Sequence, residues 1–384
     1  MAYPVADPYR QAIRNSLTIS YTVRATLNGT VVPGCEALQP TGGTITDTTK
    51  PGVRRVLNLQ LAPMPGLFDK LDPVGTLLSA TAHVQYTNRT IVDIPMGVFD
   101  VDRETFAEGG GELSLTAPDK WQKIARARFL WPTGPQIGIK VTDQIVFLIR
   151  DVLGPTEPVN VLATSQATVG SLTWDKDRDK AINDLAADIG AWVYFDRLGI
   201  ATVADVPTIG ASADWLIDAS GAGVMTSLDR SRDRAKSYNV VVVTSSATTG
   251  EAFPTQYVWD SDPTSRTYAG TAPQFGTDAG PFGIVPYFHD TPLPLTIDGA
   301  RAAGAAILAR TVGLASQASM GQVPNPAVDA FDVLDVLPPE ERYDIDRVLE
   351  RHIADNVTHP LKTDGDPAPA QNIDGRSTRA DEYS

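Results

Sequence analysis

Cysteine is nearly absent from this sequence, and its scarcity excludes several kinds of chemistry. Cys35 is the only cysteine among 384 residues, so neither an intrachain disulfide nor a cysteine-based zinc or redox motif can form. We expect Cys35 to be a small buried hydrophobic residue. Histidine is also scarce, and the four histidines are too far apart in sequence for a recognisable metal motif. They are His83, His289, His352 and His359.

Long apolar runs and excess positive charge are missing as well. Stretches such as 145–149 are far too short to cross a bilayer, so we expect no membrane insertion. The first thirty residues carry Asp7, Arg10 and Arg14 and no continuous apolar segment, so we expect no secretory signal and synthesis in a cytoplasm. The formal charge of −14 and a pI near 4.7 argue against specific nucleic-acid binding, which needs clustered Lys and Arg.

Familiar catalytic motifs are incomplete. Residues 175–179 begin like a calcium loop, but Lys180 stands where Gly is needed and Ala186 where Glu is needed. We therefore expect these acidic residues to stabilise the start of a following helix. Residues 210–214 have Asp in place of the last Gly of a nucleophile elbow. The glycines at 109–111 lack a following Lys-Ser or Lys-Thr, so they predict a hairpin turn.

Paired carboxylates are the remaining enzymatic possibility. Asp100 and Asp102 are two residues apart in an expected strand, so their side chains share a face, and a glycosidase needs two carboxyl groups that face each other. Two acidic groups on a strand face are usually solvated. We therefore predict no catalytic, cofactor-binding or metal-binding residues, and no enzymatic activity.

What the sequence has in abundance is turn-forming residues. It contains 31 Gly and 29 Pro without any period, which is typical of turns between many short strands. Because 384 residues exceed what one hydrophobic core usually serves, we expect two or three packed units. The predicted fold class is β-rich α+β.

Strict alternation marks the first strands. Residues 16–25 place apolar and polar side chains on opposite faces, and Asn28 with Gly29 favours a type I′ turn into a return strand at 30–32. Residues 57–61 and 78–87 repeat the alternation, which leaves His83 on a polar face. Residues 1–117 are therefore predicted to form an antiparallel β-barrel or sandwich domain.

Helical patterns follow. Pro118 is suited to open a short helix, and Thr142 to cap a second helix that ends at Leu153. A third helix is expected over about 177–189, and a strand pair over 191–206. Residues 118–207 are predicted to be a small α+β domain.

The last region returns to strands. Residues 238–243 suit a central strand buried on both faces, and an Ala-rich helix is expected over about 297–312. Residues 208–362 are predicted to form a second β-barrel domain, with a long extended loop at 253–295 that we expect to be interfacial. The polar segment 363–384 is predicted to be a flexible tail.

The order of these parts resembles a known family. The resemblance rests on four stretches at 113–121, 186–196, 238–242 and 331–336, and it covers roughly residues 15–362. Together they look like the minor tail proteins of actinobacterial siphophages, which are similar to phage tail baseplate hub proteins. The resemblance implies two tail-tube-like β-barrel domains with a smaller α+β domain between them.

It also implies a role and partners. Such hubs form a ring, commonly a homotrimer, which joins the tail tube to the tip and surrounds the DNA exit channel. The implied partners are further copies of the chain, the distal tail protein or tail tube, the tape measure protein and other tail-tip proteins of the virion. Two alternatives stay open: a tail-associated protein that binds or degrades the cell wall, and a cytoplasmic binding module unrelated to phages.

Overall fold

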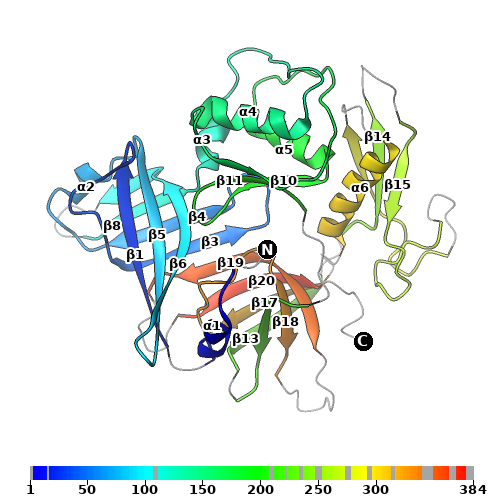
Figure 1. The fold of residues 1–384 in the computed structure, drawn as a ribbon. Helices are drawn as coiled ribbons and strands as arrows, with labels where there is room; N and C mark the ends of the chain where they lie inside the picture. The colour runs from blue at the N-terminus through cyan, green and yellow to red at the C-terminus, as the bar shows by residue number, and fades with distance from the viewer. Residues whose placement is uncertain are drawn as a thin grey trace.

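The computed structural model arranges the chain as two β-rich regions, a helical region above them and a small α/β unit to one side (Figure 1). In the described part of the chain, no helix is both long and apolar enough to cross a membrane. The structure describes residues 3–14, 17–106, 111–206, 212–221, 223–232, 237–246, 253–272, 278–291, 296–312, 316–339, 349–362 and 369–377.

The elements follow one another in three groups. The first group is α1 (Asp7–Ala12), β1 (Leu17–Leu27), β2 (Thr30–Val31), β3 (Pro40–Thr48), β4 (Arg55–Leu61), α2 (Leu67–Lys70), β5 (Thr76–Tyr86), β6 (Ile91–Asp100), β7 (Arg103–Phe106) and β8 (Leu113–Pro118). The second is α3 (Trp121–Arg126), α4 (Val141–Leu153), β9 (Val159–Val161), α5 (Arg178–Asp188), β10 (Ala191–Phe195) and β11 (Ala201–Asp205). The third is β12 (Trp215–Asp218), β13 (Met225–Arg232), β14 (Val240–Ser245), β15 (Gln256–Trp259), β16 (Pro286–Thr291), α6 (Ile297–Thr311), β17 (Ser316–Gln322), β18 (Val333–Leu337), β19 (Glu350–Pro360) and β20 (Gln371–Ser377).

The predicted hairpin at the start of the chain is confirmed. Asn28 and Gly29 have φ of 50° and 78°, the positive angles that a type I′ turn requires, and β1 pairs with β2 around them. β1 belongs to a four-stranded sheet in the order β2-β1-β5-β6. Its apolar face packs on β3, β4 and β8, and Cys35 is fully buried in the same core, as expected.

A ten-stranded sheet joins the first and third groups of elements. Eight of its strands follow the order β13-β17-β20-β19-β3-β4-β8-β7, while β12 and β18 attach beside β19. β19 connects the two halves, because its first residues pair with β18 and its last residues, 356–360, pair with β3. The chain is thus β-rich with several antiparallel sheets, as the sequence predicts. Closure into barrels, and the boundaries at 117 and 207, stay predictions.

The helical region agrees with its prediction except at two helix starts. α3, α4 and α5 pack on one another beside the sheet β10-β11-β9. Pro118 ends β8 instead of opening a helix, because the Asp119 carboxylate accepts hydrogen bonds from the backbone N–H of Arg54, Arg55 and Trp121, each at 3.0 Å. Thr142 is buried and does not cap α4, whose N-cap residue is Lys140.

The prediction of a long extended loop at 253–295 is partly wrong. β15 and β16 lie within it and pair with the two sides of β14, which is the central strand that the apolar run at 238–243 predicted. A strand buried on both faces needs hydrogen-bonded neighbours on both edges, and this segment provides them. α6 covers the face of β14 that carries Val241 and Val243.

The prediction of a flexible tail at 363–384 is wrong for 371–377. There the chain forms β20, which pairs with β17 on one side and β19 on the other. Burial alternates along this strand: Gln371 and Ile373 are fully buried, while Asn372 and Asp374 are exposed. The alternation is not visible in the sequence because most of these residues are polar. The expected hairpin turn at 109–111 falls mostly on residues 107–110, which lie outside the described residues.

We expect Ile373→Ala to lower the free energy of unfolding by about 2–5 kcal/mol, because it empties part of a well-packed core. Denaturant unfolding measures the change. Asn372→Ala on the exposed face of the same strand is the matched control and should stay within about 0.5 kcal/mol of the wild type. Equal effects of the two substitutions would contradict the placement of β20.

Candidate functional site

Five buried charged residues meet between the three groups of elements. They are Asp47, Arg54, Arg55, Arg197 and Asp329, between 1% and 6% exposed, and we call them the charged junction. Arg54 donates from Nε and Nη2 to the two oxygens of Asp47 at 2.6 and 3.1 Å. Arg55 Nη2 donates to Asp329 Oδ1 at 2.9 Å, and Arg197 Nε donates to Asp329 Oδ2 at 2.9 Å. Each carboxylate is therefore shared between two arginines.

The junction connects distant parts of the chain. Asp47 and Arg55 are cross-strand partners in β3 and β4, Arg197 lies in the turn between β10 and β11, and Asp329 precedes β18. The remaining guanidinium N–H groups donate to backbone carbonyls. The acceptors, at 2.8–3.1 Å, are Pro95, Phe195, Pro326, Val328 and Ala330.

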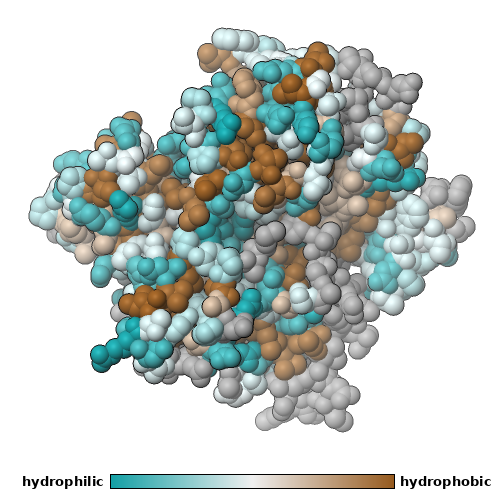
Figure 2. Space-filling model, viewed as in Figure 1, coloured by the Kyte–Doolittle hydropathy of each residue, from teal (hydrophilic) through white to brown (hydrophobic). Residues whose placement is uncertain are grey.

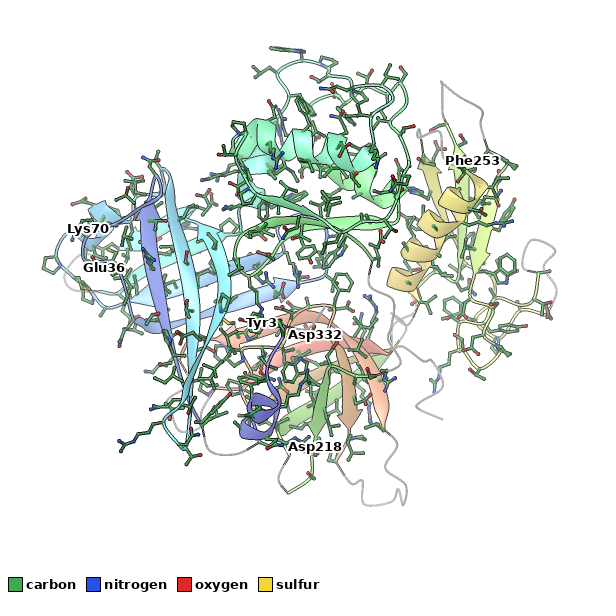
Figure 3. The ribbon with its side chains drawn as sticks, viewed as in Figure 1. Tyr3, Glu36, Lys70, Asp218, Phe253 and Asp332 are labelled. Carbon is green, nitrogen blue, oxygen red and sulfur yellow. The ribbon has the colours of Figure 1, made fainter. Side chains whose placement is uncertain are left out.

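The surroundings of the junction decide which acids stay charged. The arginines hold the pKa of Asp329 well below its usual range, despite full burial. Burial, and then repulsion from Asp329, raise the pKa of Asp332 to about 7. Burial also raises the pKa of Asp119 to about 6. Asp332 is labelled near the middle of Figure 3, and its Oδ2 accepts hydrogen bonds from Trp215 Nε1 at 3.0 Å and from the Asp329 backbone N–H at 2.9 Å.

Asp100 and Asp102, the carboxylates considered as a catalytic pair, each form an ion pair with a basic residue. Lys123 Nζ lies 3.2 Å from Asp100 Oδ1, and Arg126 forms an ion pair with Asp102. Both basic residues belong to α3, so these pairs attach the helix to the end of β6. Burial raises the pKa of Asp100, although Lys123 opposes the shift. The geometry is that of a structural contact.

The structure does not bring the acidic residues of the calcium-like loop or the four histidines together into one site. Asp177 and Asp179 lie at the N-terminus of α5, as expected, and Arg128 approaches Asp177 at 3.5 Å. The four histidines contact four different partners, and the described residues hold no cluster of three potential metal ligands. These partners are Asp93 for His83, Asp188 for His289, Glu350 for His352 and Gln371 for His359.

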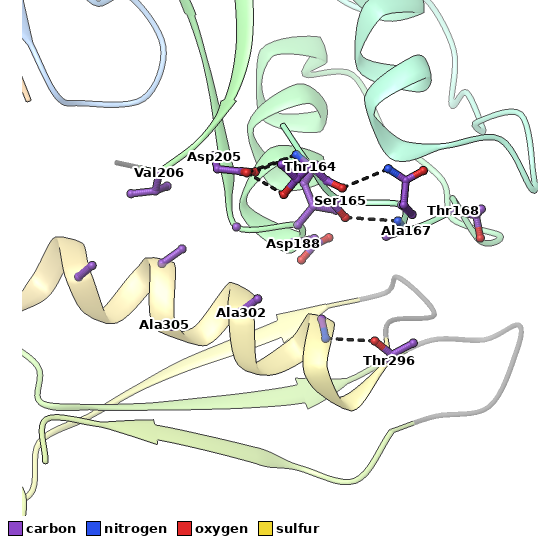
Figure 4. Close-up of a pocket in the computed structure, with 16 residues that line it drawn as sticks. Thr164, Ser165, Ala167, Thr168, Asp188, Asp205, Val206, Thr296, Ala302 and Ala305 are labelled. Carbon is purple, nitrogen blue, oxygen red and sulfur yellow. Dashed lines mark hydrogen bonds between the residues drawn. The ribbon is translucent and has the colours of Figure 1, made fainter. Parts of the chain in front are cut away.

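A groove of about 700 Å³ separates α6 from the segment 164–168 (Figure 4). Two carboxylates border it, and both have partners within the chain. Asp205 accepts hydrogen bonds from the backbone N–H and the hydroxyl of Thr164, and Asp188 pairs with His289 at 3.0 Å. Asp188 ends α5 and His289 lies in β16, so this pair joins the two elements, and burial raises the pKa of Asp188. Among the described residues that line the groove, the two acids are therefore both paired.

One face of the large sheet carries polar side chains in register across five strands. Each residue of the row is the cross-strand partner of the next. In order they are Thr48 of β3, Asn356 of β19, Asp374 of β20, Ser319 of β17 and Asp229 of β13. Asn356 Nδ2 and Ser319 Oγ donate to the two oxygens of Asp374 at 3.2 and 2.8 Å. A hollow of about 1010 Å³ runs along the row. We call this surface the open face.

Apolar side chains gather on the helical region. Figure 2 shows a brown area over the part of the molecule where α3 and α4 lie. Among the exposed large apolar side chains of this region are Leu130, Trp131, Ile137 and Phe147, with exposed fractions of 88%, 67%, 69% and 48%. An exposed apolar patch of this kind is typical of a surface that contacts another protein.

Comparisons with known proteins identify the fold. No protein-family model and no curated protein sequence matches the chain. The solved tail protein from Neisseria meningitidis MC58 superposes with a TM-score of 0.60 at 11% identity, over 94% of this chain and 98% of that one. The 43 kDa tail protein of prophage MuSo2 from Shewanella oneidensis gives 0.54 at 12%, over 94% and 99%. Prophage tail protein gp18 from Listeria monocytogenes EGD-e gives 0.54 at 9%, over 94% and 95%.

These three structures extend over nearly the whole chain, so its fold is that of phage tail proteins. Sequence reasoning found this class but missed the charged junction. The only signal was two adjacent arginines, Arg54 and Arg55, at the start of an otherwise apolar alternation.

We expect Asp329→Asn to destabilise the protein by about 3–5 kcal/mol, because it leaves buried arginines without their carboxylate partner. Thermal and denaturant unfolding measure the loss. Asp184→Asn is the control, since its pair with Lys180 is exposed and is worth only about 0.3–0.5 kcal/mol. A loss no greater than that of the control would show that the junction is dispensable.

Asp332→Asn should change how stability depends on pH. The folded protein holds the Asp332 proton up to about pH 7, whereas the unfolded chain releases it near pH 4. The free energy of unfolding of the wild type therefore falls as pH rises from 4 to 7, because the unfolded chain releases this proton more readily than the folded protein. Asn has no proton to release in this range, so the variant lacks this loss. The variant should gain stability relative to the wild type across this window and stay level above it. A difference that is independent of pH would refute the assignment.

Proposed function

We propose that this chain is a structural component of a bacteriophage tail tip, of the baseplate-hub or minor-tail-protein kind found in actinobacterial siphophages. In this role it forms a ring, with three copies as the expected number, that joins the tail tube to the tip around the DNA exit channel. The observation that carries the proposal is the likeness to three phage tail proteins over 94% of the chain.

The open face supports a position beside passing DNA. Its five-strand row presents hydroxyl and amide groups and the carboxylates of Asp229 and Asp374, with no basic residue in the row. Lys50, Arg230 and Arg376 border the hollow outside the row, and the two arginines are paired with Glu350 and Asp355. Like charge keeps a duplex from adhering to such a wall.

The apolar patch over α3 and α4 supports contact with other proteins. Its exposed aromatic and aliphatic side chains are of the type enriched at the centres of protein interfaces. In the proposed assembly this surface contacts the distal tail protein or tail tube, the tape measure protein or another tail-tip protein. A chain that works through such contacts needs no catalytic group, and we propose that it is not an enzyme.

A direct comparison separates this proposal from the cell-wall alternative. We expect the purified chain at micromolar concentration to form closed oligomers, with masses that are multiples of 41.1 kDa in mass photometry. We expect it to release no reducing sugar or peptide from bacterial cell wall. Release that disappears in Asp100→Asn would favour a hydrolase, and a strict monomer under all conditions would argue against the ring.

DNA binding tests the position of the open face. The assembled wild type should not retard a short linear duplex at about 0.15 M salt, because affinity there depends on phosphate neutralisation by basic residues. Asp229→Lys combined with Asp374→Lys should create binding that weakens steeply with salt. Asp143→Lys combined with Asp184→Lys changes the net charge equally on α4 and α5, and should bind less tightly. Tight binding by the wild type would contradict the proposed channel.

A further inference from the structure

A hollow of about 310 Å³ lies where all three groups of elements meet (Figure 1). Its lining comes from the turn between β3 and β4, from α5 and β10, and from β16 and α6. Pockets for small ligands often form where separate units meet, and their volumes are roughly 300–1,000 Å³. We call this one the aromatic hollow, because Trp192, Tyr194 and Tyr287 line it.

Trp192 and Tyr194 form one wall of the aromatic hollow. They lie two residues apart in β10, on the face opposite to buried Val193, and their rings stack at a centroid distance of 4.1 Å. The guanidinium carbon of Arg54 lies 5.1 Å from the centre of the Trp192 ring and 4.8 Å from that of Tyr194. Because Asp47 fixes Arg54 in the charged junction, this wall is held in place before a ligand binds.

The opposite wall belongs to β16. The ring of Tyr287 packs edge to face against Tyr238 at 5.4 Å, and His289 follows two residues later in the same strand. His289 Nε2 lies 3.0 Å from Asp188 Oδ1. An ionised carboxylate only accepts hydrogen bonds, so Nε2 carries the proton of the neutral ring and Nδ1 is left as an acceptor.

The polar ends of these aromatic side chains are not used within the chain. In the part of the chain that the structure describes, the indole N–H of Trp192 and the hydroxyls of Tyr194 and Tyr287 have no hydrogen-bond partner. Exposed Lys50 also lines the hollow, and no described carboxylate pairs with it. Asn183 adds an amide, which both donates and accepts. Donors and acceptors therefore line the same aromatic hollow.

This combination fits a saccharide better than the other ligands of aromatic pockets. Sugar rings pack their C–H faces on aromatic side chains, and each sugar hydroxyl both donates and accepts a hydrogen bond. A proline-rich peptide also packs on aromatic rings, but proline has no backbone N–H to offer His289 Nδ1. A phosphate ester calls for several free basic side chains, whereas Arg54 is already bound to Asp47 and only Lys50 is unpaired among the described lining residues.

We propose that the aromatic hollow is a binding site for a short, neutral saccharide. Its donors are Trp192, Tyr194, Tyr287 and Lys50, and His289 Nδ1 is its acceptor. The inference goes beyond the proposed function and does not depend on the ring, since every lining residue belongs to one copy of the chain. A tail-tip protein with such a site holds a sugar by contact alone, without cleaving it.

Ligand binding by the full-length purified protein tests the site. The saccharide probes are maltose, lactose, N,N′-diacetylchitobiose and methyl α-rhamnoside, and the competing classes are represented by a decaproline peptide and inorganic phosphate. Saturation-transfer NMR detects binding, and isothermal titration calorimetry measures the affinity. The site variant carries Tyr194→Phe and Tyr287→Phe, which remove only the two hydroxyls. Its matched control is Tyr257→Phe, an exposed tyrosine of β15 that does not line the hollow.

We expect saturable binding of at least one of the saccharides to the wild type. The site variant should bind it at least about fivefold more weakly, because two hydrogen bonds to the ligand are lost, and the control should bind like the wild type. Circular dichroism verifies that both variants are folded.

Three results would overturn the saccharide site. They are no binding of any saccharide probe, equal affinity in the wild type and the folded site variant, and tighter binding of decaproline or phosphate than of every sugar. Each of them leaves the ring untouched, because the mass of the assembly is measured separately. A monomeric wild type that binds a saccharide through these tyrosines would in turn support the site while arguing against the ring.

Discussion

The structure depends most on the burial of three arginines with two aspartates where its parts meet. Arg55 begins β4 and Arg54 directly precedes it, Arg197 comes from the β10–β11 turn, and Asp329 from the segment before β18. Removing such charges from water is costly, and only near-complete pairing and hydrogen bonding offsets the cost. The buried charges are therefore fully paired in one relative position of the three groups of elements, and other relative positions are strongly disfavoured.

That constraint has a consequence for the large sheet. Asp47 and Arg55 are cross-strand partners in β3 and β4, so the junction holds the sheet close to where β19 joins its halves. A sheet fixed in this way presents its open face as one surface, although its strands come from both ends of the sequence. In a ring, such rigidity allows a wall to be assembled from preformed pieces, with little ordering required on association.

Local patterns in the sequence predicted most of the elements, because alternation and turn chemistry act over few residues. The β1–β2 hairpin needs only Asn28, Gly29 and a regular alternation around them. The pairing of β19 with β3 could not be predicted in this way, since nothing near residues 350–360 specifies a partner at residues 44–48. The strand at 371–377 was missed because Ile373 is its one large apolar residue among mostly polar ones.

The charged junction was beyond sequence reasoning for a related physical reason. Burial of a charge depends on partners that the fold brings together, and Asp47 and Asp329 are far apart in the chain. By contrast, the absence of a nucleophile elbow or a metal motif could be read from single stretches. Sequence therefore indicated the class of fold better than it indicated the contacts that hold the protein together.

The central claim is that copies of this chain assemble around a channel with the open face turned inward. Electron microscopy of the assembled wild-type protein tests it most directly. The account predicts closed rings with a central opening lined by the open face, including Asp229 and Asp374. Compact dimers without an opening, open filaments, or rings with the helical region facing the lumen would contradict it.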